Sequence, residues 1–394
     1  MQNSIKLSLI SVALLSQVNA SEVHSVKDMF TDGKTSGQIR LGYYNSNPDA
    51  IGKTQSVTAI GGQLKFESAS FNGMSAGVAM YTSQNIDALS GEENDGKFSD
   101  YLTSSEKSYT ELAEAYLNYS VDNFNIRIGR QLIDTPLADS DDVYMTPNTF
   151  EAVVASYALK DLGLTFIGAN LQRMQGGDAD YLNVTNNSWM DTGDNGTNML
   201  AILYANDAIE VGAWYYDVDK SAKAIYVDAT ANFEIAKNNV LALSAQYLDE
   251  SEKDNSAVDG TIAGMMLEVS LDKLTASIAY NTIDVDATKE IFEGFGGGCS
   301  YTNMETTTAG TLNTDSDAYL ISLSYDIAKL NIFTSYGEFK ADYSANGHLT
   351  ELDAGVSYSF NDETQVSFVY VNVDDKLATD SGADEIKLFA NYTF

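Results

Sequence analysis

The chain has 394 residues, of which 44% are hydrophobic and 11% are aromatic. Fifty-six acidic residues against 22 basic ones give a net charge of -34, which argues against binding to nucleic acid or docking on an anionic lipid surface. One cysteine excludes a disulfide framework. The sequence contains no run of about 18 apolar residues, so no helical membrane span is predicted. Cations are the natural small partners of so acidic a chain.

Residues 1–20 have the features of a secretory signal peptide. Lys6 precedes an apolar run at residues 7–15, and Val18, Asn19 and Ala20 place small or apolar residues where a signal peptidase cleaves. A short buried N-terminal helix is the alternative, but nothing caps it. We therefore expect Sec-type export, with residues 21–394 as a single mature domain.

From about Thr35 onward, short segments alternate between apolar and polar residues, as expected for β-strands with two different faces. In the first segment Ile39, Leu41 and Tyr43 alternate with polar neighbours, among them Arg40. Helical periodicity is nearly absent. The sequence predicts an all-β protein.

The lengths of the links between these segments distinguish a soluble sandwich from a membrane barrel. Links near 70–74, 120–123, 159–163, 206–208, 234–239, 271–273, 326–329 and 361–363 are short. Those near 46–54, 84–108, 132–149, 173–197, 219–222, 249–260, 283–317, 340–350 and 373–384 are mostly long. Strict alternation of the two kinds predicts a transmembrane antiparallel β-barrel of about 18 strands, with short periplasmic turns and long extracellular loops.

Aromatic residues at the strand ends favour the same topology, because belts of Tyr and Phe mark both membrane interfaces of a barrel. Ordinary cross-strand pairing in a soluble sheet is the alternative. The expected belt toward the long loops comprises Tyr43, Tyr44, Tyr81, Tyr215, Tyr216, Tyr247, Tyr280, Tyr336 and Tyr370. The opposite belt comprises Tyr119, Phe233, Tyr325, Phe360 and Phe394.

A barrel of this size is too wide for side chains to fill, so its polar inner face predicts a water-filled channel. The loop segment at 132–150 contains two of the three prolines, Pro136 and Pro147, together with several aspartates. Such a stiffened loop could fold into the lumen with its acids facing basic wall residues and set the selectivity. It could equally be an outward loop with solvated acids.

The residues of this region resemble the constriction loop of the OprD-type porins and the related major outer-membrane porins of epsilonproteobacteria. The likeness rests on Ile128-Gly129-Arg130-Gln131, on Asp134-Thr135-Pro136-Leu137-Ala138-Asp139, on Pro147-Asn148-Thr149-Phe150-Glu151 and on the terminal Tyr392-Thr393-Phe394. It extends over nearly all of 37–394. The resemblance implies an 18-stranded porin, often trimeric, that passes small solutes passively, with Arg127 and Arg130 facing the loop acids.

The expected pore constriction combines wall residues with loop aspartates. The candidates are Arg40, Lys65, Glu67, Glu114, Arg127, Arg130, Asp134, Asp139, Asp141 and Asp142. Arg130 has the parity of the lipid-facing Ile126 and Ile128, so it needs a bulge or a strand end to reach the lumen. Few arginines are present, which argues against a basic ladder for carboxylate substrates.

Other functions have weaker support. An outer-membrane enzyme would need a histidine base, and His24 and His348 have no recognisable triad spacing. Asp139, Asp141 and Asp142 could bind calcium, although no twelve-residue Ca²⁺ loop is present, and solvated or arginine-paired aspartates are favoured. The glycine-rich residues 294–298 predict a flexible loop element and no nucleotide site.

The sequence therefore predicts an outer-membrane porin for ions and small hydrophilic solutes, with a preference for cations. A structural or adhesive barrel with exposed loops is the alternative. We expect no catalytic residues, no metal and no cofactor. The expected partners are outer-membrane lipid, lipopolysaccharide, solutes and cations, and a possible homotrimer.

Overall fold

The computed structural model describes residues 22–104, 107–181, 189–286, 288–343, 347–377 and 382–394. The expected signal peptide at 1–20 lies outside these residues. None of the helices in the described ranges is long and apolar enough to span a membrane.

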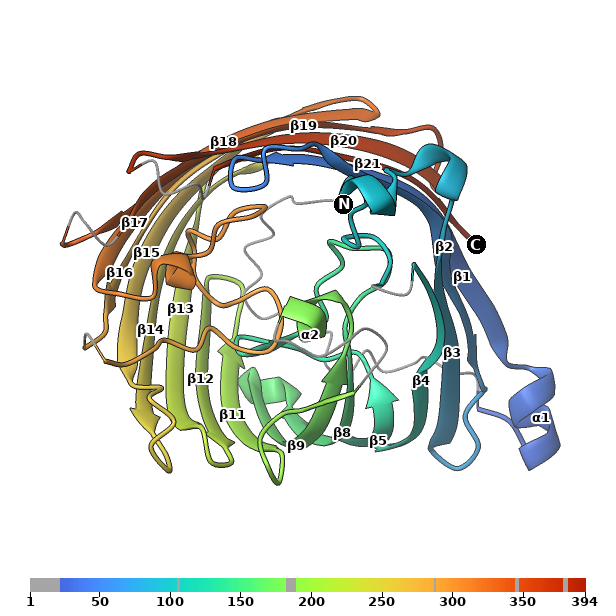
Figure 1. Cartoon of the computed structure of the whole chain (residues 1–394). Helices are drawn as coiled ribbons and strands as arrows, with labels where there is room; N and C mark the ends of the chain where they lie inside the picture. The colour runs from blue at the N-terminus through green and yellow to red at the C-terminus, as the bar shows by residue number, and fades with distance from the viewer. Residues whose placement is uncertain (1–21, 105–106, 182–188, 287, 344–346, 378–381) are drawn as a thin grey trace.

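Most of the described strands form one antiparallel sheet that closes on itself where β21 pairs with β1 (Figure 1), and β6 and β7 form a separate two-stranded sheet. Nineteen strands take part, one of which is the two-residue β10, so the wall has the 18 strands expected from the sequence. The wall strands are β1 (Lys34–Pro48), β2 (Gln55–Glu67), β3 (Met74–Asn85), β4 (Ser108–Val121), β5 (Phe124–Gln131), β8 (Thr149–Leu159), β9 (Leu164–Gln175), β11 (Thr197–Ala205), β12 (Ile209–Val218), β13 (Ala222–Ala236), β14 (Asn239–Glu252), β15 (Gly260–Leu271), β16 (Leu274–Asp284), β17 (Ser316–Ile327), β18 (Leu330–Ala341), β19 (His348–Ser359), β20 (Thr364–Asp375) and β21 (Ala383–Thr393).

The remaining elements lie in the links. They are α1 (Val26–Thr31), η2 (Asp87–Leu89), η3 (Glu93–Asp95), β6 (Asp134–Thr135), β7 (Ala138–Asp139), η4 (Lys160–Leu162), α2 (Gly177–Tyr181), β10 (Met190–Asp191) and η5 (Ala309–Leu312). Helix α1 stands outside the ring of strands in Figure 1. Its Met29 packs with Val23 against Ala69 in the turn between β2 and β3.

The links confirm the expected alternation of short turns and longer loops. Tight two-residue turns join β13 to β14 and β15 to β16, and their Asn238 and Asp272 have left-handed φ values of 62° and 51°. Asn and Asp tolerate this backbone conformation, which suits strand reversal in a hairpin. At the long-loop end, the loop between β12 and β13, at residues 219–221, is a short connection.

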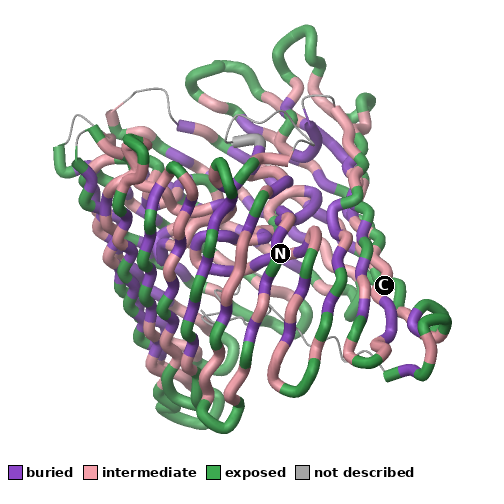
Figure 2. Tube along the Cα trace, turned by 90° about the horizontal axis from the view of Figure 1, so that it is seen from below, coloured by how far each residue is buried: buried purple, intermediate pink, exposed green. Residues whose placement is uncertain are grey.

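Burial alternates along the strands, as Figure 2 shows. Outward side chains such as Ile39 and Ile278, each 51% exposed, form the apolar face expected of a membrane barrel. The aromatic belt expected toward the long loops is partly wrong. Tyr44, Tyr81 and Tyr216 point inward and are buried, Tyr81 donating a hydrogen bond to Glu114.

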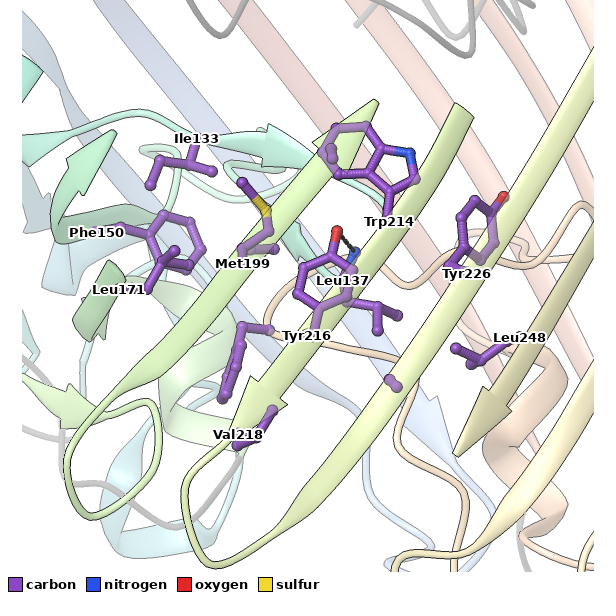
Figure 3. Close-up of a cluster of buried hydrophobic side chains, with 14 of the residues drawn as sticks. Ile133, Leu137, Phe150, Leu171, Met199, Trp214, Tyr216, Val218, Tyr226 and Leu248 are labelled. Atoms are coloured by element: carbon purple, nitrogen blue, oxygen red, sulfur yellow. Dashed lines mark hydrogen bonds between the residues drawn. The ribbon is translucent and has the colours of Figure 1, made fainter. Parts of the chain in front are cut away.

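The expectation of a polar inner face holds for only part of the barrel. Along one side of the wall, inward apolar side chains pack beneath loop residues 132–148 and form a hydrophobic core inside the barrel (Figure 3). Its members include Ile133, Leu137, Phe150, Leu171, Met199, Trp214, Tyr216, Tyr226 and Leu248. This packing removes water from that side of the lumen and leaves the open space on the other side.

Candidate pore and its constriction

The link between β5 and β8, at residues 132–148, folds into the barrel. Its β6–β7 hairpin turns at Pro136 and Leu137. The Thr135 hydroxyl donates a hydrogen bond to the carbonyl of Ala138 across the turn. Leu137 at the tip is 1% exposed, and its N–H donates to the Tyr216 hydroxyl over 3.4 Å (Figure 3). Apolar burial at the tip therefore holds the loop against the wall.

Arg40 of β1 fixes the far end of the same loop. Its guanidinium donates two hydrogen bonds to the Asp142 carboxylate, at 2.7 and 2.8 Å, and one to the carbonyl of Tyr144. A further bond to Asn391 of β21 holds the side chain in place. Arg40 is 2% exposed, whereas the side chain of Asp142 is 44% exposed, so the bidentate geometry and the buried guanidinium hold this pair together.

A second loop, at residues 285–315, also folds into the barrel. Phe295 exchanges backbone hydrogen bonds with the first loop, donating to the carbonyl of Leu137 over 3.0 Å and accepting from the N–H of Asp139 over 2.9 Å. Gly294 and Gly296 flank it with φ values of 114° and 119°. A Cβ on Gly294 would lie 2.7 Å from the Leu137 Cα, so the close approach requires glycine. The glycine-rich segment is thus a fixed contact between two loops.

Residues of the wall that the sequence interpretation missed anchor this second loop. Glu351 of β19 accepts the N–H groups of Thr306 and Thr307, at 2.9 and 2.7 Å. The Lys387 ammonium of β21 lies 3.2 Å from a carboxylate oxygen of Glu305. The strand pattern predicts that Glu351 and Lys387 point inward. It does not predict which loop contacts them.

Between the two loops and the opposite wall lies a cavity of about 1210 Å³. Strands β15 to β21 and β1 supply most of its wall. Nine acidic residues and one basic residue, Lys329, line it. The acids are Asp141, Asp178, Glu268, Glu293, Glu305, Asp326, Asp353, Asp362 and Glu385. The lining of the cavity is therefore strongly acidic in composition.

Three tyrosines join the acids at the edge of this cavity. Tyr101 stacks on Tyr44 with 3.9 Å between ring centroids and lies at an angle against Tyr144 at 4.9 Å. The Tyr44 hydroxyl donates to Glu385, and the Tyr144 hydroxyl donates to Asp178. The tyrosine hydroxyls orient these carboxylates.

The loop aspartates of the sequence prediction take different places. Asp141 lines the cavity, whereas Asp142 pairs with Arg40. Asp134 accepts the N–H of Ser140, and Asp139 accepts the N–H of Asp141, so both stabilise the turn of the loop.

Four of the predicted wall residues form a separate inward cluster around Tyr116 on β2, β4 and β5. Lys65 lies 3.0 Å from Glu114 and 3.6 Å from Glu67, and Arg127 stacks over the Tyr116 ring at 4.4 Å. Lys65, Glu67, Glu114 and Arg127 are not among the residues that line the 1210 Å³ cavity.

Arg130 is not placed in the lumen, and the expectation that it lines the pore needs correction. The pairing of β5 with β4 and β8 runs without a register shift through Arg130, so its side chain keeps the outward parity of Ile128. It lies 3.7 Å from Glu151, a residue of β8 on the same outward face. No bulge in β5 turns Arg130 inward.

Crowding of carboxylates changes their acidity in the inward loops. Burial, with the charges of Asp178 and Asp139, raises the pKa of Asp141 to about 8. Burial likewise raises the pKa of Asp139 to about 6, and it raises the pKa of Asp178. Asp141 and Asp139 therefore titrate in a range close to neutral pH.

Within the described residues, no group of three or more His, Cys, Asp or Glu side chains is arranged to hold a metal ion. Asp142, one of the three aspartates considered as calcium ligands, is engaged by Arg40.

Comparisons with known proteins agree with this geometry. Residues 236–394, which include strands β14 to β21, match the family model described as Gram-negative porin. No curated protein matches the chain.

Solved structures of outer-membrane channels share the fold along almost the whole chain. OccAB4 of Acinetobacter baumannii is 15% identical, with 92% of this chain and 98% of that chain covered at a TM-score of 0.79. OpdK of Pseudomonas aeruginosa, solved with vanillate, is 16% identical over 93% and 99%, at 0.78. OpdQ of the same organism is 17% identical over 93% and 99%, at 0.77.

These comparisons and the closed barrel define the class of protein. The closed barrel and the match of residues 236–394 to the Gram-negative porin family support an outer-membrane channel for small solutes. The likeness to the OccAB4, OpdK and OpdQ structures shows that the fold is the one expected from the resemblance to OprD-type porins.

Proposed function

We propose that the channel prefers cations and that the loop at 132–150, together with residues 285–315, forms its constriction. The observation that carries the proposal is the ratio of nine acids to one base around the cavity. Two further inward basic residues, which do not line the cavity, are already engaged, Arg40 by Asp142 and Lys387 by Glu305. The carboxylates of the cavity therefore set the sign of the field that a solute meets.

The substrate class follows from the same field. Vanillate, which occupies the OpdK structure, is an aromatic carboxylate. An anion of that kind would meet Glu305 and Glu385 here, and the approach of like charges is unfavourable. Small ammonium compounds and inorganic cations suit this channel better than carboxylates.

Permeation through protein-containing vesicles tests the proposal. Liposomes are exposed to two organic solutes of matched size, one with an ammonium group and one with a carboxylate group, and swelling rates are compared. The ammonium solute is expected to enter faster by about fivefold at low salt, and the difference should narrow as salt screens the field. Equal rates, or faster entry of the carboxylate, would contradict the proposed preference.

Conductance separates this function from the alternative of a structural or adhesive barrel. A folded barrel that conducts no ions in a planar bilayer would support the alternative.

The signal peptide, the lipopolysaccharide contact and the homotrimer remain predictions. The homotrimer can be checked by the mass of the purified protein in detergent.

A further inference from the structure

Arg130 belongs to a row of charged residues that crosses three neighbouring strands on the outside of the barrel. In the register of the sheet, Arg130 of β5 lies opposite Glu151 of β8, and Glu151 lies opposite Arg173 of β9. All three are at the strand ends next to the long loops. Since long loops mark the extracellular side of such a barrel, the row lies at the level of the outer-leaflet headgroups.

The contacts within this row leave both arginines able to bind a further anion. Glu151 lies 2.7 Å from one terminal nitrogen of Arg173 and 3.7 Å from Nε of Arg130. Arg130 also donates from Nη1 to the carbonyl of Leu112. A guanidinium has five N–H donors, so one carboxylate and one carbonyl do not satisfy the pair. The side chains of Arg130 and Arg173 are 32% and 37% exposed.

An aromatic ring completes the row. Trp189 lies beneath both guanidinium groups, 4.6 Å from Arg130 and 5.7 Å from Arg173. Tryptophan is enriched where a membrane protein meets the lipid headgroups, and its ring fixes the planes of the two guanidiniums. Contact with one ring therefore limits the orientations of both guanidinium groups.

The rest of the outward rim has the opposite charge. Outward positions at the same ends of other strands carry mostly aspartates, namely Asp249, Asp284, Asp317, Asp374 and Asp384. Three acids lie near the arginines. They are Glu151 within the row, Asp191 opposite Arg173 in the register of β10, and Glu111 of β4, which interacts electrostatically with Arg130. An anionic lipid approaching this rim meets paired arginines at this row.

We propose that Arg130 and Arg173, positioned by Trp189, bind a phosphate group of a lipid in the outer leaflet, the phosphorylated glycolipid of the lipopolysaccharide. Arginine pairs recognise phosphate through several parallel N–H donors, and desolvation at the headgroup boundary strengthens such bonds. Glu151 competes with the phosphate for the same guanidiniums and limits the affinity.

The test measures lipid retained by the full-length barrel in detergent, by native mass spectrometry. The probes are bisphosphorylated lipid A and the same lipid with its phosphates removed. Wild type is expected to bind the phosphorylated form more tightly, and the R130Q/R173Q variant should lose about tenfold in affinity for it. The matched control is K223Q/K340Q, which removes two other outward basic residues of the rim and should leave the affinity unchanged.

A third variant keeps the test informative if the double arginine variant folds poorly. E151Q removes the competing carboxylate, so its affinity for the phosphorylated lipid should rise by about threefold. Equal binding of both lipids by wild type, no loss in folded R130Q/R173Q, or weaker binding by E151Q would each overturn the proposal. Full displacement of the lipid by millimolar inorganic phosphate would assign the row to free phosphate and would also overturn it.

Discussion

Arg40 is the residue through which the wall holds the first inward loop. We predict that R40A loosens residues 141–145, because the bonds to Asp142 and Tyr144 are lost and each hydrogen bond to a charged group contributes on the order of 2 kcal/mol. The measurement is single-channel recording, in which the open-state current noise should increase. R40K, which keeps the charge but not the bidentate geometry, should lie between wild type and R40A. Noise unchanged in R40A would mean that the tip at Leu137 holds the loop alone.

The acidity of Asp141 and Asp139 predicts a pH dependence of selectivity. With a pKa of about 8 for Asp141 and about 6 for Asp139, both carboxyls gain protons as the pH falls from 9 to 5. Protonation removes negative charge from the constriction, so the preference for cations should decrease on acidification. Reversal potentials recorded across this pH range check the prediction.

D141N provides the control for this titration. It removes the group with the higher pKa, so the upper part of the pH dependence should disappear while the part near pH 6 remains. A profile identical to that of wild type would show that other carboxylates of the cavity govern the selectivity.

Strand parity allows part of the site to be predicted from single residues. Alternation alone places Arg40, Glu114 and Arg127 inward and Arg130 outward, as the structure has them. Alternation does not tell which inward residues face water and which are packed beneath a loop. Trp214 and Tyr216 look like their outward neighbours in sequence, because both faces of β12 carry apolar side chains, and only contact with a distant loop buries them.

The first inward loop is the element whose removal tests the constriction. Deleting residues 137–146 removes the tip, Asp141 and the partner of Arg40, and it leaves Phe295 without its backbone hydrogen bonds. Single-channel conductance and the solute exclusion size should both increase, because this loop forms one side of the opening. If a correctly folded variant has unchanged conductance and exclusion size, other parts of the barrel form the constriction.

The second inward loop can be followed through the single cysteine of the chain. Cys299 lies in this loop, and burial holds the pKa of its thiol well above the usual range, so it should react slowly with thiol reagents. E351Q weakens the acceptor of the Thr306 and Thr307 N–H groups, and the labelling rate of Cys299 should rise by about tenfold. The control is E338Q, an outward substitution on β18.

If E351Q leaves the labelling rate of Cys299 at the wild-type value, the contacts of Glu305 and Phe295 suffice to hold the loop. If E338Q accelerates labelling as much as E351Q does, the effect is a general loosening of the barrel and not a release of this loop.

The wall strands and the lengths of their links were predictable from the sequence, because local patterns encode them. The alternation of apolar residues and the lengths of the links were enough to predict 18 strands and the two rims. Residues 285–315 show the limit. Their inward fold depends on Glu351, Lys387 and Leu137, which lie far away in sequence, and a glycine-rich segment has the same local pattern whether it is free or packed.

Over the whole molecule, the interior divides into a packed side and an open side. Apolar residues of β8 to β15 pack with the first loop, and the cavity is displaced toward β15 to β21. The closed, hydrogen-bonded wall stabilises the barrel, and the inward loops confine the open space to one side of it. Mainly acidic residues line the open side, in keeping with the net charge of -34 on the whole chain.

The reversal potential of the reconstituted channel in a tenfold gradient of potassium chloride tests the preference for cations most directly. The acidic cavity predicts a potential with the sign of potassium permeation, which shrinks toward zero as the salt concentration rises on both sides. A potential with the sign of chloride permeation at low salt would contradict the assignment of a cation-preferring channel.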